Sequence, residues 1–574
     1  MTKTRRLELR TDHDTERLVN EAAACPRWGS ADGPTPGVPP ATLETMTSPT
    51  RNSETGTLAT GDLQTPSEVP VTPETPPAEA PGGNETVEGA TPEETTSAAH
   101  DIQMSDELRA SITQGWGTQP EIPHPARADG AEFTARRRQA LSRAFPGQTV
   151  VVPAGPLTTR ANDTEYPFRA DSSFTWLTGE TAADAVLVLA PSGGSAHQAT
   201  LYLREYVGPG DLGYFTDRRH GSIWVGGVPS VARTQDALGL NVRPLSDLNA
   251  AVSGRDAVCV EGVDPDVESL VSGRDGARLA QVLDELRLVK DEWEIARLQH
   301  ACDATARGFA DVAHELPMLL ERGGARGERW LEGTFWRRAR LEGNEVGYTS
   351  ILGAGAHGTT LHWWRNDGTI APGQLLLADM GVETDELYTA DVTRTMPVTG
   401  DWTANQLKVY RAVLEAQDAG IAEVKAGADF LAAHRAAMWV LADHLHSWGI
   451  LAVPADVSCA TDIEAPGAGL HRRYTLHGTS HMLGIDVHDC ARARAEVYPK
   501  GQLDAGNVLT VEPGLYFQPH DETVPSDLRG LAVRIEDDIL VTDGAAVNLS
   551  AALPRDPVEI SAWMRAAQAA PSVG

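Results

Sequence analysis

The sequence predicts an α/β protein with two ordered domains that follow a disordered N-terminal tail. The chain has 574 residues, which exceeds the usual length of one domain. From about residue 131 onward, short runs of Val, Ile and Leu alternate with amphipathic segments, as in α/β proteins. Before residue 104 this alternation is missing and the composition is different. We therefore expect the folded part to begin well inside the chain.

Residues 1–103 form the expected tail. They contain few aromatic residues and are rich in Pro, Thr, Glu and Ser, as residues 65–77 illustrate. Such a composition cannot bury enough apolar surface to offset the entropy lost on ordering. We expect this segment to be disordered. An over-extended reading frame is the alternative, with Met46 or Met104 as the true start.

The first ordered domain is expected over residues 131–275. It opens with a basic amphipathic helix, closed by a Pro-Gly pair, and continues with strands that alternate with helical segments. Together these elements predict an α/β domain. The expected helix is 135–145, and the expected strands are 149–152, 185–189, 199–203 and 257–260.

The second domain is expected over residues 290–567. A long helical passage, 276–315, leads into it, and further helices and strands follow. Several of its strands are apolar runs interrupted by single acids. The expected helices are 405–426 and 430–448, and the expected strands are 375–381, 387–398, 508–517 and 531–541.

Four acids in these strands are candidate metal ligands. Asp379 and Asp391 lie on the two arms of an expected hairpin, and Glu512 and Glu536 interrupt later strands. An acid inside an apolar strand is costly to bury unless it is paired or binds a metal. The nearby strand cations are Arg394 and Arg534, too few for four acids. Buried salt bridges are the alternative, but we favour a metal site.

The segment 477–489 supplies three histidines to the same domain. His477 and His481 lie in an expected loop, and the alternation after Gly484 predicts a short strand over 485–488. Ordinary surface histidines are the alternative. The carboxylates in the neighbouring strands favour His481 as a fifth ligand.

The ligand set indicates two divalent ions. Four carboxylates with one imidazole carry too much negative charge for one ion and nearly balance two, as in dinuclear hydrolytic sites. Oxygen ligands with one nitrogen and no thiolate suit Mn²⁺, and Co²⁺, Zn²⁺ or Fe²⁺ could substitute. Structural zinc is disfavoured because closed structural sites favour cysteine.

Composition excludes other classes of function. The formal net charge of −32 argues against nucleic-acid and anionic-membrane partners. The sequence has no run approaching the roughly twenty apolar residues of a membrane span, and its first residues show no secretory signal. The five cysteines are scattered without CxxC spacing. We therefore expect a cytoplasmic protein.

Taken in order, four motifs resemble the pita-bread metallopeptidases. They are Asp-Val-Thr-Arg-Thr at 391–395, His-Gly-Thr-Ser-His-Met-Leu-Gly at 477–484, Val-Glu-Pro-Gly at 511–514 and Arg-Ile-Glu-Asp at 534–537. The resemblance covers about residues 131–565. It implies a creatinase-like N-terminal domain followed by a pita-bread catalytic domain. Asp379 and Asp391 are twelve residues apart, where the family usually has eleven, so we expect a longer hairpin turn around 384–386.

The resemblance implies roles for the metal ligands. Asp391 and Glu536 would bridge two ions, Asp379 would chelate one of them, and His481 and Glu512 would complete the other. Other carboxylates are expected to be solvated or to act behind the ligands, and His357 is expected to be structural. These carboxylates are Asp489, Asp537 and Asp538.

The resemblance also implies catalytic roles. His362 would lie near the scissile nitrogen, and His488 would polarise the scissile carbonyl or bind the oxyanion. Glu512 would carry a proton from water to the leaving amine. His477 would line the pocket, and Arg534 would orient Glu536 or a tyrosine, Tyr516, from behind.

Within the family, the chain resembles the aminopeptidase P branch. Residues 131–275 argue against methionine aminopeptidases, and the complete ligand set argues against creatinase. Residues 162–179 resemble the aminopeptidase P N-terminal domain. The branch implies cleavage of the first residue from peptides with proline at the second position, and a homodimer or homotetramer. The alternatives are prolidase, restricted to Xaa-Pro dipeptides, and a non-catalytic binding protein of the same fold.

Overall fold

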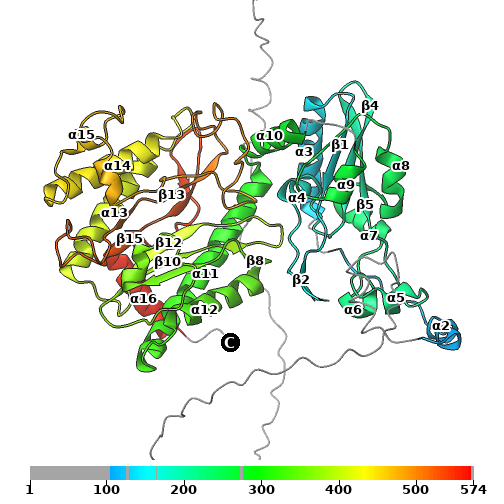
Figure 1. Cartoon of the computed structure of the whole chain (residues 1–574), viewed down its shortest axis with the longest axis horizontal. Coiled ribbons are helices and arrows are strands. Elements are labelled where there is room, and N and C mark those ends of the chain that lie inside the picture. Colours follow the sequence, from blue (N-terminus) through cyan, green and yellow to red (C-terminus); the bar gives the residue numbers. More distant parts are fainter. Residues whose placement is uncertain (1–103, 125–127, 163, 272–275, 571–574) are drawn as a thin grey trace, which may run out of the picture. The chain divides into compact units, whose positions relative to one another are not determined.

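The computed structural model describes residues 104–124, 128–162, 164–271 and 276–570 (Figure 1). The expected disordered tail, residues 1–103, lies outside the described residues. The described residues form an N-terminal α/β domain and a second α/β domain, as expected from the sequence. No helix of this described part is long and apolar enough to cross a membrane.

The N-terminal domain is built on a five-stranded sheet in the order β6-β5-β4-β1-β7. The pairs β1–β4 and β4–β5 are antiparallel, whereas β1–β7 and β5–β6 are parallel. All residues of β1 are buried, because apolar clusters cover both faces of the sheet. The strands are β1 (Thr149–Pro153), β4 (Val186–Gly193), β5 (Ala196–Leu203), β6 (Asn241–Pro244) and β7 (Ala257–Cys259).

Helices and a small hairpin complete this domain. The expected opening helix is α3, Ala131–Ala144, and it contacts the short helix α4, Ser172–Thr178. Asp171 caps α4 by accepting the backbone N–H of Phe174, which fixes the start of that helix. The other elements are α2 (Asp106–Ile112), β2 (Thr159–Ala161), β3 (Thr164–Glu165), α5 (Gly213–Thr216), α6 (Ser222–Val225), α7 (Val231–Leu238), α8 (Leu248–Val252) and α9 (Pro265–Ser269).

The helical passage expected over 276–315 is two helices rather than one. They are α10, Gly276–Arg287, and α11, Glu292–Glu321. Asp291 accepts the backbone N–H groups of Trp293 and Glu294, and the Glu294 side chain accepts the Asp291 N–H. This reciprocal capping box starts a new helix at this point. The expected helical passage is therefore confirmed, with a break at 288–291 that the sequence analysis did not place.

The second domain combines small sheets with long helices. In Figure 1 its central strands lie between α13 and α14 on one side and α11, α12 and α16 on the other. The helices are α12 (Gly327–Glu342), α13 (Ala404–Ala422), α14 (Ala432–Ser447), α15 (Ala455–Ser458) and α16 (Pro557–Ala569). The strands are β8 (Glu345–Val346), β9 (Ile351–Ala354), β10 (Leu375–Met380), β11 (Val382–Glu383), β12 (Val392–Pro397), β13 (Val508–Val511), β14 (Gly514–Tyr516), β15 (Ala532–Arg534), β16 (Asp537–Leu540) and β17 (Val547–Asn548).

Strand pairing in this domain brings distant segments together. The antiparallel pairs are β9–β10, β10–β12, β8–β11, β13–β16, β16–β17 and β14–β15. The expected strand 531–541 is divided into β15 and β16, which pair with different partners. The intervening residues, Ile535 and Glu536, are thereby placed between two sheets.

The short strand expected over 485–488 is absent, and the chain turns there instead. The Gly484 N–H donates to the Asp486 carbonyl, and the Asp489 N–H donates to the Met482 carbonyl. These local bonds use backbone groups that a strand would pair with a neighbour. We call residues 485–489 the histidine loop, because they carry His488.

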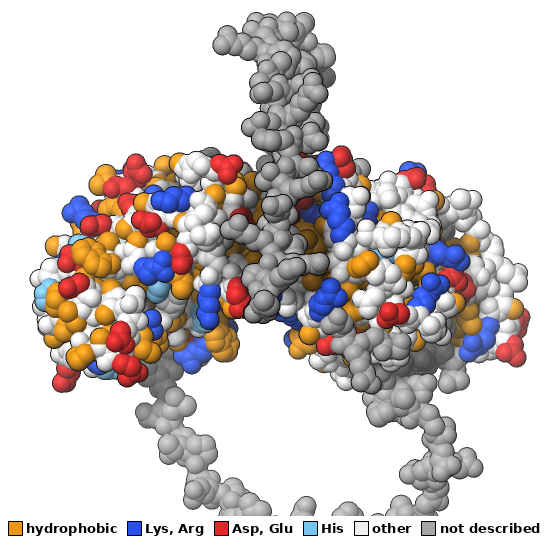
Figure 2. Space-filling model, turned by 90° about the horizontal axis from the view of Figure 1, so that it is seen from above, with side chains coloured by type: hydrophobic (Ala, Val, Ile, Leu, Met, Phe, Trp, Pro, Cys, Tyr) orange, Lys and Arg blue, Asp and Glu red, His pale blue; other side chains and the backbone are white. Residues whose placement is uncertain are grey.

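Charged side chains of both signs are interspersed on the face of the molecule that Figure 2 shows. Acidic, basic and hydrophobic side chains alternate over short distances on this face. The acidic excess of the sequence is therefore not gathered into one patch of this face.

Candidate metal centre

The site is built on the β10–β12 hairpin, which confirms the predicted strand pairing. Asp379 lies opposite Thr393 in the register, and Asp391 immediately precedes β12. Both carboxylates are buried, with 7% and 5% of their residue surface exposed. Between the arms, the turn at Thr384 is closed by a bond from the Leu387 N–H to the Thr384 carbonyl. The hairpin therefore buries Asp379 and Asp391 in the same domain interior, although they are twelve residues apart in the sequence.

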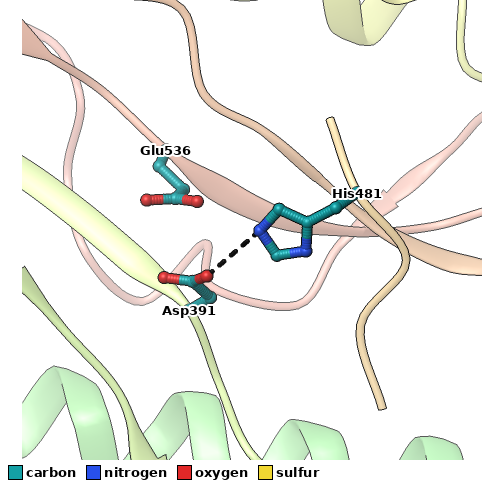
Figure 3. A group of neighbouring side chains, drawn as sticks. All are labelled: Asp391, His481 and Glu536. Atoms are coloured by element: carbon teal, nitrogen blue, oxygen red, sulfur yellow. Dashed lines mark ion pairs between the residues drawn. The ribbon is translucent and has the colours of Figure 1, made fainter. Parts of the chain in front are cut away.

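A histidine and a later glutamate join Asp391. Ligand atoms of Asp391, His481 and Glu536 lie within 4.8 Å of one another, and their side chains point toward a common centre (Figure 3). His481 Nε2 is 3.3 Å from Asp391 Oδ2. The three residues come from the start of β12, from the loop before the histidine loop, and from the junction of β15 and β16. Oxygen and imidazole ligands at this spacing can hold a divalent ion.

The two remaining candidate ligands lie beside this group. Glu512 Oε1 is 3.6 Å from His481 Nε2, and the Glu512 N–H donates to the Thr479 carbonyl at 2.8 Å. Asp379 accepts a hydrogen bond from the Tyr348 hydroxyl at 2.6 Å and another from the Arg534 guanidinium. All five predicted ligands therefore lie close to one another, but only Asp391, His481 and Glu536 have ligand atoms that are mutually within 4.8 Å.

Hydrogen bonds lock Glu536 to the hairpin. The Thr393 hydroxyl donates to Glu536 Oε2 at 2.6 Å, and the Glu536 N–H donates to the Thr393 carbonyl at 3.1 Å. Arg534 Nε donates to the same hydroxyl at 3.0 Å. Arg534 therefore reaches Glu536 through Thr393, while its Nη1 donates directly to the Tyr516 hydroxyl at 3.1 Å.

The cluster has an excess of buried negative charge. Burial and the neighbouring carboxylates raise the pKa of Glu536 well above its ordinary value, and burial raises the pKa of Glu512 to about 7. Burial also raises the pKa of Asp379, although Arg534 acts in the opposite direction. Burial would lower the pKa of His481, but the hydrogen bond to Asp391 raises it to about 9. Protein cations do not neutralise four carboxylates here, so the donor set fits bound divalent cations.

His477 and His488 adjoin the cluster. The His488 ring is 4.4 Å from that of His481, and its side chain is exposed. His477 Nε2 is 2.8 Å from the Tyr516 hydroxyl, and its Nδ1 is 3.5 Å from Glu512. Burial lowers the pKa of His477 to about 4 and also lowers that of His488, which favours neutral rings at neutral pH.

His362 lies on a separate segment that faces the same histidines. It follows a short 3₁₀ turn, Gly355–Thr359, and its side chain is exposed. A positive charge on this ring would lower the pKa of both His477 and His488, so the ring lies within electrostatic range of them. The neighbouring His357 stacks on Trp363 and bonds Glu328, a contact within the supporting loop.

Three carboxylates next to the motifs are buried and paired, which excludes the solvated alternative and agrees with the expectation that they act behind the ligands. Asp537 accepts Arg394 Nη2 at 2.7 Å, and Asp538 Oδ2 accepts the Asp391 N–H at 3.1 Å. Asp489 is bound by Arg287 and by Lys290 Nζ, the latter at 2.9 Å.

Sequence reasoning missed Tyr348 and Thr393 as neighbours of the ligands. Thr393 is two residues from Asp391 and opposite Asp379 in the register, so the predicted hairpin could have identified it. Tyr348 lies in a loop before β9, where no sequence pattern indicates its contact with Asp379.

Comparison with known proteins places this fold and site in a defined class. The profile of "Metallopeptidase family M24" matches residues 296–543, and that of "Aminopeptidase P, N-terminal domain" matches residues 134–256. The catalytic part is therefore that of a metallopeptidase.

Full-length relatives define the class further. The chain is 49% identical over 467 residues to Xaa-Pro aminopeptidase 2 of Streptomyces coelicolor, covering 80% of this chain and 96% of the relative. It is 32% identical over 463 residues to the Xaa-Pro aminopeptidase of Escherichia coli, covering 76% and 98%. The structure of E. coli aminopeptidase P with the inhibitor Pro-Leu matches with a TM-score of 0.67 and 30% identity, covering 78% of this chain and all of that chain. The chain belongs to the M24 metallopeptidases, as an Xaa-Pro aminopeptidase with an aminopeptidase P N-terminal domain.

Proposed function

We propose that this chain releases the first residue from peptides with proline at the second position, using two divalent ions held by its five candidate ligands. The observation that carries the proposal is the compact group of Asp391, His481 and Glu536, whose ligand atoms lie within 4.8 Å. Asp379 and Glu512 border that group and would complete the set. In this proposal Asp391 and Glu536 would bridge the two ions, Asp379 would bind one of them, and His481 and Glu512 would complete the other.

We infer that the ions are Mn²⁺. Oxygen ligands with one imidazole and no thiolate suit Mn²⁺, although Co²⁺ or Zn²⁺ could bind the same set. A solved structure of E. coli aminopeptidase P is described as zinc-substituted, and it matches this chain with a TM-score of 0.66. When bound, such ions supply Lewis-acid chemistry, which lowers the pKa of water and stabilises negative charge on oxygen.

The residues of the chain provide proton transfer and orientation. The Glu512 carboxylate, beside His477 and His481, would hold the proton lost by the attacking water and release it to the leaving nitrogen. The exposed ring of His488 would donate to the scissile carbonyl oxygen as negative charge develops there. His362 would lie at the scissile nitrogen. His477 and Arg534 would hold Tyr516 between them and so fix the wall of the pocket.

This constellation suits a bond to proline. An Xaa-Pro bond is a tertiary amide without an N–H, so a peptidase that binds that N–H cannot engage it. Carbonyl polarisation by His488 and water attack need no such donor. We further propose a cytoplasmic homodimer or homotetramer, in keeping with its scattered cysteines and its family.

Substrate length tests the proposal against prolidase. The full chain is expected to release Arg from Arg-Pro-Pro, because an aminopeptidase accepts a substrate that continues beyond proline. The measurement is the rate of free arginine formation, with Ala-Pro assayed in parallel. Cleavage of Ala-Pro without cleavage of Arg-Pro-Pro would establish prolidase instead, and cleavage of neither would favour a non-catalytic binding protein.

Metal removal tests the dinuclear site. Chelation is expected to abolish release of arginine, and added Mn²⁺ is expected to restore it, because the attacking water is activated by the ions that the four carboxylates bind. Metal analysis of the active protein is expected to give about two ions per chain. Full activity in protein with no measurable metal would contradict the proposal.

A further inference from the structure

One arginine of the N-terminal domain is bonded chiefly to the catalytic domain. Arg169 lies between β3 and α4, three residues before Ser172, the first residue of that capped helix. Its Nε donates to Glu383 Oε2 at 2.7 Å, and its Nη2 donates to the Ile485 carbonyl at 2.7 Å. The same Nη2 is 3.4 Å from Asp486 Oδ1. A single guanidinium therefore joins two segments of the other domain.

The first of these segments is the metal-binding hairpin. Glu383 belongs to β11, between Asp379 and Asp391, and 4% of its side chain is exposed. Its second carboxylate oxygen accepts Asn344 Nδ2 at 2.8 Å. Glu383 is thus hydrogen-bonded within the catalytic domain, and Arg169 binds a nearly buried carboxylate of the hairpin.

The second segment is the histidine loop, which has no strand partner. Asp486, two residues before His488, accepts the Ser172 hydroxyl at 2.5 Å and Arg287 Nη2 at 2.6 Å. Arg169 Nη1 donates to that Ser172 hydroxyl at 2.9 Å. On the other side of His488, Arg287 and Lys290 bind Asp489. The position of His488 therefore depends on ion pairs rather than on a sheet.

We propose that Arg169 is a positioning residue of the reaction, which sets His488 relative to the hairpin by binding Glu383 and the histidine loop at once. The inference rests on the proposed function, because it assumes that His488 acts on the substrate carbonyl. It gives the N-terminal domain a part in the chemical step of the same chain. The reacting groups themselves all lie in the catalytic domain.

The chemistry of the side chain explains why an arginine is required. A guanidinium is planar and offers donors in fixed directions, so it can bind a carboxylate and a carbonyl simultaneously. A lysine ammonium is a single point charge and cannot span both at the same distances. A displacement of about 1 Å in a catalytic group can reduce the rate about a hundredfold.

The primary test compares Arg169→Ala and Arg169→Lys with wild type in the full chain loaded with Mn²⁺. Both variants are expected to lower kcat for Arg-Pro-Pro by roughly ten- to a hundredfold while KM changes little, because His488 acts in the transition state. Low concentrations of guanidinium chloride are expected to recover part of the kcat of Arg169→Ala. Recovery would show that this variant is folded and lacks only the group removed.

Arg204→Ala is the matched control. Arg204 is also in the N-terminal domain and also pairs with an aspartate, Asp184, at 3.0 Å, but that pair lies within its own domain. This variant is expected to keep the wild-type kcat and to show no response to guanidinium. A fall in kcat equal to that of Arg169→Ala would indicate a general effect of N-domain ion pairs and overturn the proposal.

A double variant tests whether Arg169 acts through His488. If it does, adding Arg169→Ala to His488→Ala is expected to lower kcat no further, because the group being positioned is already gone. Multiplicative effects, or a fully active His488→Ala, would overturn the proposal. An active wild type with an equally active Arg169→Ala would overturn this proposal alone, whereas an inactive wild type would overturn the proposed function with it.

Discussion

Asp391→Asn is expected to reduce kcat/KM for Arg-Pro-Pro by about a thousandfold or more, since loss of a bridging carboxylate removes several kcal/mol of transition-state stabilisation. The amide has the same shape and can still hydrogen bond, so the fold should persist around a site that is 5% exposed. The measurements are steady-state rates, metal content and the thermal unfolding midpoint. We expect the metal content to fall and the midpoint of the metal-free protein to change little.

Asp385→Asn is the control for this substitution. Asp385 is an exposed acid in the turn of the same hairpin, six positions before Asp391. The same chemical change there should leave kcat/KM within about twofold of wild type, because exposed charges contribute little. Near-wild-type turnover by Asp391→Asn, with both ions retained, would show that Asp391 is not a bridging ligand.

Arg394→Ala is expected to destabilise the catalytic domain by about 3–5 kcal/mol, because it removes the nearer of the two arginines that pair with a buried carboxylate and leaves only Arg555 Nε, at 3.4 Å. Arg394 is 2% exposed and Asp537 is fully buried. The guanidinium donates to Asp537 and to four backbone carbonyls, so all its N–H groups are used. Calorimetry should show the midpoint lowered by roughly 6–20 °C. Arg394→Lys should recover only part of this loss, since one ammonium cannot serve five acceptors.

Arg435→Ala provides the comparison for that loss. Arg435 pairs with Asp429 at 3.4 Å in the same domain, but about half of each side chain is exposed. Exposed pairs of this kind contribute about 0–1 kcal/mol, so the midpoint should hardly move. Equal shifts for the two arginines would mean that burial of the Arg394–Asp537 pair is not what stabilises the domain.

The hairpin of Asp379 and Asp391 was predictable because its information is local. Apolar arms, an acid on each arm and a polar turn lie within about twenty consecutive residues, and the pairing of β10 with β12 confirms them. The start of a new helix at Asp291 is also indicated locally, by the capping-box spacing of Asp291 and Glu294. The apolar periodicity on both sides made the passage resemble a single helical segment.

The histidine loop could not be predicted, because its conformation is decided by residues far away in the sequence. The alternation of Ile485, Asp486, Val487 and His488 is typical of a strand, yet Asp486 is bound by Ser172 and Arg287. Those partners are 314 and 199 positions away. A period-two pattern of apolar and polar residues does not indicate that Asp486 binds distant side chains. Here these tertiary contacts outweigh the local preference for a strand.

The five donors of Arg394 also constrain when the site can be completed during protein synthesis. Two of them reach the Leu553 and Pro554 carbonyls, and another reaches the carbonyl of Glu536. On the ribosome, the N-terminal domain can fold as a unit before these residues exist. The proposed ligands, in contrast, remain incompletely held until residue 554 has been made. We therefore expect metal loading to follow the synthesis of residue 554, so that the nascent polypeptide passes through a partly folded stage without activity.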